Sequence, residues 1–197
     1  MGSAQTPAKT AVRDRLLTTR RRRPLAERNQ ASAALRDVVL AAPEVRGAAT
    51  VAAYVSVGTE PGTGLLLDAL LRAGRRVLLP VLLPDGDLDW AVHTGDRDLV
   101  TASRGLLEPR GPRLGPEAVA TADVVLVPGV AVDAEGLRLG RGGGSYDRAL
   151  ARVPVGTFTC VLLYDDELGV EVPGEPHDRR VLAAATPSGV IRLADGG

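Results

Sequence analysis

The sequence of 197 residues has a single cysteine, few aromatic residues, no net charge and no long apolar run. Because Cys160 stands alone, an internal disulfide is excluded, and the sequence suits a reducing compartment such as the cytoplasm. The 24 basic residues balance the 24 acidic ones, which leaves no overall field to attract nucleic acid or a membrane surface. The longest apolar run, VAAYVSV, is too short to span a bilayer.

The remaining composition is typical of a globular domain. Apolar residues make up 45% of the chain and charged residues 24%. Residues 1–12 lack the apolar core of a secretion signal. Arg20 to Arg23 form a basic run that could contact nucleic acid, but in a neutral chain with 3% aromatic residues we expect no such partner. We predict one domain, residues 1–197, that works as a monomer.

Hydrophobic patterning predicts an α/β fold with a mostly parallel sheet and helices on both faces. The predicted helices are two between Thr10 and about Ala42, broken near Pro24, one at 64–74 with Thr63 as its cap, and one at 146–152. The predicted strands are 49–57, 75–83 with an end or bulge at Pro80, 88–93, 122–133, 157–164 and 183–193. Ligands bind such sheets beyond the carboxyl ends of the strands, where the segments GTEPGT, GLLEP and a glycine-rich loop fall.

The glycine-rich loop lies in RLGRGGGSYDRAL, residues 138–150. Gly140 to Gly144 contain four glycines interrupted by Arg141, and glycines let backbone N–H groups approach a phosphate closely. A helix that begins near Tyr146 would add its free N–H groups, and Arg138 and Arg141 would add charge. A flexible surface turn is the alternative. The spacing fits neither a dinucleotide fingerprint nor a Walker loop, so we predict an anion site of another kind.

Three further charged positions have two interpretations each. Asp147 could hold Mg²⁺ beside phosphates, or it could be an acid favoured in the first turn of a helix. Lys9 and Arg13 share one helix face and would suit phosphates, although solvated charges are the commoner explanation. Glu60 follows a buried strand, where carboxylates recognise ligand amides, and a solvated loop acid is equally ordinary. These residues are candidates whose roles the local sequence leaves open.

Other reactive side chains indicate no further chemistry. His93 and His177 have no Cys or His neighbours at metal-ligand spacing, so we expect no zinc site. Cys160 falls in the middle of a predicted strand and is interpreted as a core residue. Ser145 does not sit in a G-x-S-x-G elbow, so a hydrolase nucleophile is not supported.

Taken together, these segments resemble the 5-formyltetrahydrofolate cyclo-ligase family, also called methenyltetrahydrofolate synthetases. The longest match is LVPGVAVDAEGLRLGRGGGSYDRAL at 126–150, close to the family signature Pro-Gly…Asp…Gly-x-Arg-Leu-Gly-x-Gly-x-Gly-x-Tyr-Asp. Shorter matches in the expected order are KTAVR at 9–13, YVSVGTEPGT at 54–63, VLLP at 77–80, GLLEP at 105–109 and VPGEPHD at 172–178. The resemblance covers nearly the whole chain.

The resemblance implies an activity and a set of site residues. The family uses ATP and Mg²⁺ to convert 5-formyltetrahydrofolate into 5,10-methenyltetrahydrofolate, through a phosphorylated formyl group that N10 of the folate then displaces. The implied ATP-binding residues are Lys9, Thr10, Ala11, Val12, Arg13, Arg138, Leu139, Gly140, Arg141, Gly142, Gly143, Gly144, Ser145 and Tyr146. The implied folate-binding residues are Val55, Glu60, Arg141, Gly142, Gly143, Gly144 and Ser145. Asp147 is the implied Mg²⁺ ligand, and no covalent catalyst is expected.

The chain departs from the family pattern at two positions. Ser145 replaces a frequent second tyrosine, which removes an aromatic wall but keeps the backbone path. Leu182 stands where the family tail often has an acid close to the metal. Because leucine cannot bind Mg²⁺, a non-catalytic protein that sequesters folate or nucleotide is the rival hypothesis.

Overall fold

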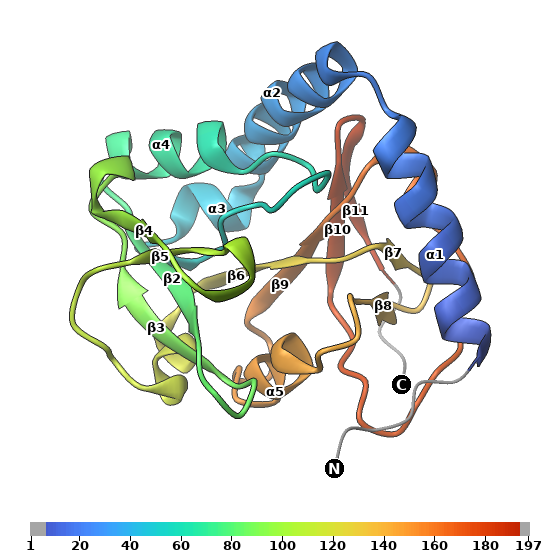
Figure 1. The fold of residues 1–197 in the computed structure, drawn as a ribbon. Helices are drawn as coiled ribbons and strands as arrows, with labels where there is room; N and C mark the ends of the chain where they lie inside the picture. Colours follow the sequence, from blue (N-terminus) through green and yellow to red (C-terminus); the bar gives the residue numbers. More distant parts are fainter. Residues whose placement is uncertain (1–6, 194–197) are drawn as a thin grey trace.

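The computed structural model describes residues 7–193 and contains a seven-stranded sheet with the order β11-β10-β9-β6-β1-β2-β3 (Figure 1). The five inner strands pair in parallel, and β3 and β11 are antiparallel edges. The strands are β1 (Thr50–Ala52), β2 (Arg76–Leu82), β3 (Leu88–Val92), β6 (Val124–Pro128), β9 (Phe158–Leu162), β10 (Ala183–Thr186) and β11 (Gly189–Arg192). The predicted mostly parallel sheet is confirmed.

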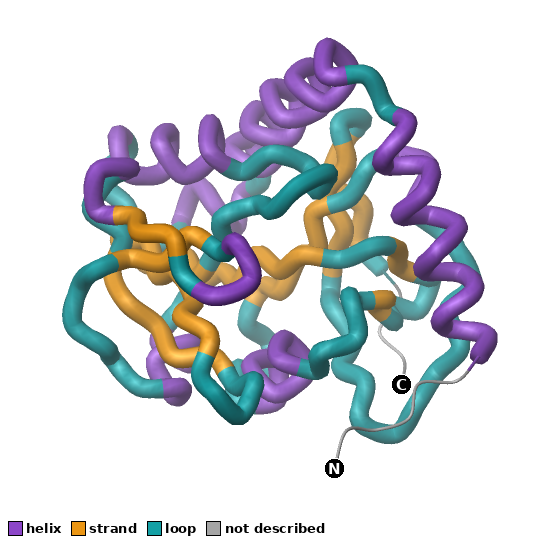
Figure 2. The backbone as a smooth tube through the Cα atoms, viewed as in Figure 1, coloured by secondary structure: helices purple, strands orange, loops and turns teal. Residues whose placement is uncertain are grey.

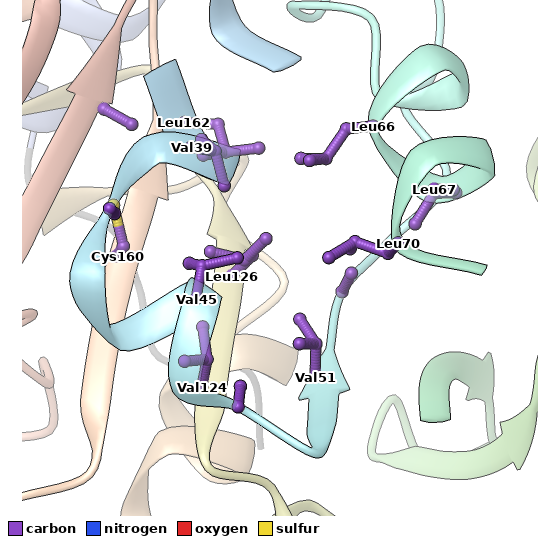
Figure 3. Packing of buried hydrophobic residues seen from close by; sticks show 14 of the residues in the cluster. Val39, Val45, Val51, Leu66, Leu67, Leu70, Val124, Leu126, Cys160 and Leu162 are labelled. Carbon is purple, nitrogen blue, oxygen red and sulfur yellow. The ribbon is translucent and has the colours of Figure 1, made fainter. Parts of the chain in front are cut away.

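Helices cover both faces of this sheet, as predicted. One face packs against α2 (Leu25–Ala41), α3 (Pro43–Gly47) and α4 (Gly64–Arg72). Figure 3 shows Val39, Leu66 and Leu70 of these helices pointing toward the strand side chains. The other face packs against α5 (Ser145–Ala151) and the 3-10 helix Pro116–Thr121. Cys160 is 1% exposed in the first of these cores, and burial raises the pKa of its thiol to about 12, which fits its predicted place in the core.

Helix α1 (Pro7–Arg22) lies away from both faces of the large sheet. Figure 2 shows it running beside loop segments on one side of the molecule. Its Leu16 packs in a small separate core with the hairpin of β7 (Ala131–Val132) and β8 (Arg138–Leu139). Pro24 separates α1 from α2, as the sequence predicts. None of the helices in the described part of the chain combines the length and apolar character needed to cross a membrane.

Two predicted strands are shorter than expected, because part of each predicted segment forms a loop instead. The strand predicted at 49–57 ends at Ala52. Ser56 and Thr63 then exchange backbone N–H to hydroxyl hydrogen bonds of 2.9 and 3.0 Å, which close a loop over residues 54–63. Thr63 occupies the N-cap position of α4, as predicted, but its hydroxyl donates to the Tyr54 carbonyl at 2.8 Å and makes no capping hydrogen bond.

The strand predicted at 122–133 is divided into β6 and β7. Where β6 ends, the Pro128 carbonyl accepts a hydrogen bond from Arg138, and the carbonyl of the next residue, Gly129, accepts one from Arg20. The strand predicted at 183–193 is likewise two strands, β10 and β11, which form an antiparallel hairpin. Long apolar runs therefore overstate strand length where the chain turns within the run.

Two other local predictions are wrong. Pro80 neither ends nor bulges β2, because β1 pairs with β2 only as far as Leu78 and the missing N–H costs no bond there. The segment that contains GLLEP is not all loop, since β5 (Leu107–Pro109) pairs with β4 (Leu99–Thr101). Both differences concern short segments beside the carboxyl ends of the central strands.

Candidate functional site

The carboxyl ends of β1 and β6 open into a cavity of about 870 Å³. Tyr54 and Val55, which follow β1, and Pro128 and Gly129, at the end of β6, line this cavity. The chain order reverses between these two strands, which makes their boundary the topological switch point of the sheet. Open α/β sheets bind ligands at such a point. The cavity therefore lies where the sequence analysis places the ligand site.

The structure gathers most of the predicted site residues around this cavity. Lys9, Arg13, Val55, Glu60 and every residue from Arg138 to Asp147 line it. Thr10, Ala11 and Val12 do not line it, although they belong to the same predicted segment. Successive residues of a helix point in different directions, so Lys9 and Arg13, four residues apart, face the cavity while the residues between them do not.

The glycine-rich loop is held at both ends. Before the loop, Arg138 donates from Nη1 to the Pro128 carbonyl and from Nη2 to Asp147 Oδ1, each at 3.1 Å. After it, the Ser145 hydroxyl donates to the Gly86 carbonyl at 2.5 Å as α5 begins. Gly144 has a φ of +69°, in the left-handed region that favours glycine. Both ends of the loop are therefore bonded to other parts of the chain, and the loop lines the cavity.

Helix α1 contributes two buried cations to the cavity. Lys9 is 4% exposed and Arg13 is 8% exposed, so their interpretation as solvated charges is wrong. Arg13 Nε donates to the Gly140 carbonyl at 2.8 Å. Lys9 Nζ donates to Glu175 at 2.8 Å and to both Asp178 oxygens, at 2.9 and 2.6 Å. Although burial opposes the charge, these bonds keep the pKa of Lys9 above its ordinary value.

Acidic groups collect beside these cations. Asp147 accepts hydrogen bonds at Oδ1 from Arg138 and from the Arg179 N–H, at 3.1 and 3.3 Å. Glu175, His177 and Asp178 bring three possible ligand atoms within 4.8 Å of one another. For His177 only Cys and His neighbours were considered as metal ligands, so a cluster with Glu175 and Asp178 was not predicted. Leu182 does not line the cavity.

The opposite wall of the cavity is apolar. It comes from the loop after β1, the β2–β3 hairpin and β5; in Figure 1, β2, β3 and β5 lie on the opposite side of the molecule from α1. Its side chains are Tyr54, Val55, Val57, Pro80, Leu82, Leu88, Leu106 and Leu107. Among them, sequence reasoning singled out only Val55. The matches YVSVGTEPGT, VLLP and GLLEP contain Tyr54, Val57, Pro80, Leu106 and Leu107, whereas Leu82 and Leu88 lie outside every match.

Glu60 and Arg141 connect the two sides. Glu60 Oε2 accepts from the Val57 N–H at 2.8 Å, and its Oε1 forms an ion pair with Arg141 Nε at 3.1 Å. The Glu60 side chain is 8% exposed and Arg141 is 49% exposed. Tyr146 lies between the walls, edge-on to Tyr54 with ring centroids 6.5 Å apart. Desolvation raises the pKa of both phenols, so both stay neutral at physiological pH.

The fold and the site together define a class, a doubly wound α/β protein with a glycine-rich loop and buried cations at its switch point. The particular family follows from comparison with known proteins. Residues 5–187 match the profile of the 5-formyltetrahydrofolate cyclo-ligase family, and the chain belongs to that family. The resemblance noted in the sequence is confirmed.

Individual relatives agree over most of the chain. The 5-formyltetrahydrofolate cyclo-ligase of Mycolicibacterium smegmatis is 43% identical over 192 residues, which cover 94% of this chain and 97% of the relative. The Escherichia coli K12 cyclo-ligase is 36% identical over 156 residues, or 75% of this chain and 83% of the relative. The NMR structure of Aquifex aeolicus 5,10-methenyltetrahydrofolate synthetase superposes with a TM-score of 0.82 at 29% identity, covering 96% of this chain and 94% of that chain.

Proposed function

We propose that this protein is an ATP-dependent ligase that cyclises 5-formyltetrahydrofolate to 5,10-methenyltetrahydrofolate and releases ADP and phosphate. Membership of the cyclo-ligase family supports this activity. The observation that carries it is the cavity of about 870 Å³, in which a cationic wall faces an apolar one. A triphosphate and a reduced pterin are the two kinds of ligand that such walls suit.

The nucleotide would lie along the cationic wall. Arg138, Arg141 and the backbone N–H groups of Gly142 to Gly144 are the proposed phosphate partners, together with Lys9 and Arg13 of α1. Lys9 already holds two carboxylates there, so a phosphate oxygen could replace them without moving the cation. Leu139, Gly140, Ser145 and Tyr146 complete the loop that encloses the triphosphate, while Thr10 to Val12 set the spacing of the two cations.

The folate would lie against the apolar wall, with Val55 and Glu60 beside its pterin. Arg141 to Ser145 lie between the two walls and would contact both substrates. This arrangement would bring the formyl oxygen toward the terminal phosphate of ATP. Positioning of this kind supplies most of the catalysis in phosphoryl transfer, so no protein nucleophile is needed.

The proposed reaction has two steps. The formyl oxygen attacks the γ-phosphorus, the bond from phosphorus to the β-γ bridging oxygen breaks, and ADP leaves. N10 then attacks the formyl carbon and loses its proton, the carbon–oxygen bond breaks, and phosphate leaves. The formyl oxygen ends in the phosphate, and the ring closes as the methenyl cation. The guanidinium groups of Arg138 and Arg141 would hold the phosphoryl oxygens throughout.

Mg²⁺ would be held by Asp147. The fit rests on Asp147 Oδ2, which has no hydrogen bond within residues 7–193, while Oδ1 is fixed by Arg138 and Arg179. When bound, the ion supplies charge neutralisation at the phosphate oxygens. Glu175 and Asp178 offer further carboxylates beside the same loop. This part of the cavity therefore contains acids although residue 182 is a leucine.

We also propose that a monomer acts in the cytoplasm. The residues assigned to both substrates all lie around one cavity of this chain, which supports a monomer. The lone Cys160 thiol suits a reducing compartment.

The test is an absorbance assay with the purified protein. Mixed with ATP, Mg²⁺ and 5-formyltetrahydrofolate, it should accumulate the ultraviolet absorbance of the methenyl product, and omission of ATP should abolish the signal. Folded protein that gives no product from intact folate would reject the proposal. If such protein still binds folate at every Mg²⁺ concentration, the non-catalytic rival replaces the ligase.

A further inference from the structure

The apolar wall of the cavity contains a buried carboxylate that the proposed chemistry does not use. Glu108 is 7% exposed, lies on β5 and lines the cavity. Leu107, the residue before it on β5, is 41% exposed, and successive side chains of a strand point to opposite faces, so the Glu108 side chain turns inward. A carboxylate in such surroundings is costly unless donors satisfy its oxygens.

Within residues 7–193, Glu108 has one hydrogen bond. The Leu82 N–H, at the end of β2, donates to Oε1 at 3.0 Å and fixes the side chain across the two strands. Neither oxygen has another hydrogen bond or ion pair in that part of the chain. A carboxylate can accept about four hydrogen bonds, so Oε2 and one lone pair of Oε1 remain for a ligand. Glu60, the other acid near this wall, has both of its oxygens engaged.

We propose that Glu108 determines specificity for the folate by accepting the two adjacent N–H groups of the pterin edge, the ring N3–H and the 2-amino group. The proposal rests on the proposed function. Two neighbouring donors on one edge match a carboxylate in bidentate geometry. Adenine presents an amino donor beside a ring acceptor, which a carboxylate repels, so the same group keeps the nucleotide out of the folate side.

Substitution E108Q separates this role from a structural one. The glutamine Oε1 still accepts from the Leu82 N–H, so the link between β5 and β2 is kept, whereas its NH₂ group meets the pterin donors. We expect binding of 5-formyltetrahydrofolate to weaken by about tenfold to hundredfold, as for loss of a charge-assisted hydrogen bond. Binding of a non-hydrolysable ATP analogue should stay unchanged. The control is E171Q, which changes an exposed acid outside the cavity.

A folate analogue locates the contact. The wild-type chain should bind a 5-formyltetrahydrofolate with methyl in place of the 2-amino group about tenfold or more weakly than the natural compound, and E108Q should lose most of that discrimination. Unchanged folate binding by E108Q, or full discrimination retained by the variant, overturns the proposal. Absence of methenyl product from the wild-type chain would refute the proposed function instead, so the two failures are distinguishable.

Discussion

The two ends of helix α1 carry buried cations in opposite settings. Arg20 is fully buried and bonds to Glu167 and the Gly129 carbonyl, with Nε–Oε1 and Nη2–O distances of 2.6 Å. Lys9 is almost as buried, yet its two carboxylate partners line the cavity. Arg20 therefore stabilises the fold, whereas Lys9 can exchange its partners for a phosphate. The surroundings of a cation, more than its burial, decide its role.

This comparison reinterprets the basic run Arg20 to Arg23. Besides Arg20, Arg23 has partners in the same chain: it pairs with Asp166 at 2.7 Å and lies 4.2 Å from the Tyr164 ring centroid. These two arginines anchor the carboxyl end of α1 to the segment after β9. They hold the helix that presents Lys9 and Arg13 to the cavity.

The largest effect is expected at the buried end. Substitution Arg20→Met leaves Glu167 charged and unpaired, and should lower the free energy of unfolding by about 3–5 kcal/mol. Urea denaturation followed by circular dichroism measures the loss. The double variant Arg20→Met with Glu167→Leu removes both charges and should recover most of the stability. A single variant as stable as the wild-type chain would show that the pair is no anchor.

A smaller effect, on activity, is expected at the cavity end. Lys9→Met should lower kcat/KM for ATP by about tenfold to hundredfold, the contribution of one charge-assisted hydrogen bond to a phosphate. Its loss of stability should be smaller than that of Arg20→Met, because cavity water can solvate the acids left behind. Steady-state kinetics test the effect on activity, and urea denaturation tests the effect on stability. A Lys9→Met variant with unchanged kinetics and lowered stability would mean that Lys9, like Arg20, only stabilises the fold.

Substitutions of Asp147 and Asp178, near the end of α1 that faces the cavity, distinguish metal binding from stabilisation of the Lys9 charge. Asp147→Asn should raise the Mg²⁺ concentration needed for half-maximal turnover by about tenfold, a loss typical even of outer-shell partners of a metal. Asp178→Asn is the matched comparison and should act mainly on the ATP requirement through Lys9. If Asp178→Asn gives the larger Mg²⁺ shift, the ion belongs to the cluster of Glu175, His177 and Asp178.

The smallest expected effect is a change in the pKa of Glu175. The hydrogen bond from Lys9 lowers the pKa of Glu175 below its ordinary value of 4.5. The stabilisation from this pair is therefore complete above about pH 4.5 and is lost as pH falls through the lowered folded pKa. In Lys9→Met the pKa of Glu175 should rise toward the ordinary value, as read from the carboxyl ¹³C shift by NMR. An unmoved pKa would mean that the pair does not form in solution.

The sequence predicts the layers of the fold well because they depend on repeating patterns. Helix and strand periodicity, with Pro24 as a break, was enough for an α/β sheet covered on both faces. It failed where single side chains override the pattern. The Thr63 hydroxyl bonds to the loop after β1 and makes no capping hydrogen bond to α4, and Arg138 bonds to the Pro128 carbonyl where β6 ends.

The residues of the candidate site likewise fall into those that the sequence predicts and those that it does not. The glycine-rich loop, Lys9, Arg13 and Glu60 could be singled out because their residue types are unusual for their positions or match a family motif. Glu108 and Glu175 were missed, since each looks like an ordinary acid until the fold brings it to the cavity. Long-range pairing of this kind, such as Lys9 with Glu175, leaves no local signal in a single sequence.

A crystal structure with a non-hydrolysable ATP analogue and Mg²⁺ tests the central claim most directly. The account predicts the triphosphate against Gly140 to Gly144, with Arg138, Arg141 and Lys9 within hydrogen-bond distance of its oxygens. A nucleotide bound elsewhere, with the glycine-rich loop empty, would contradict it.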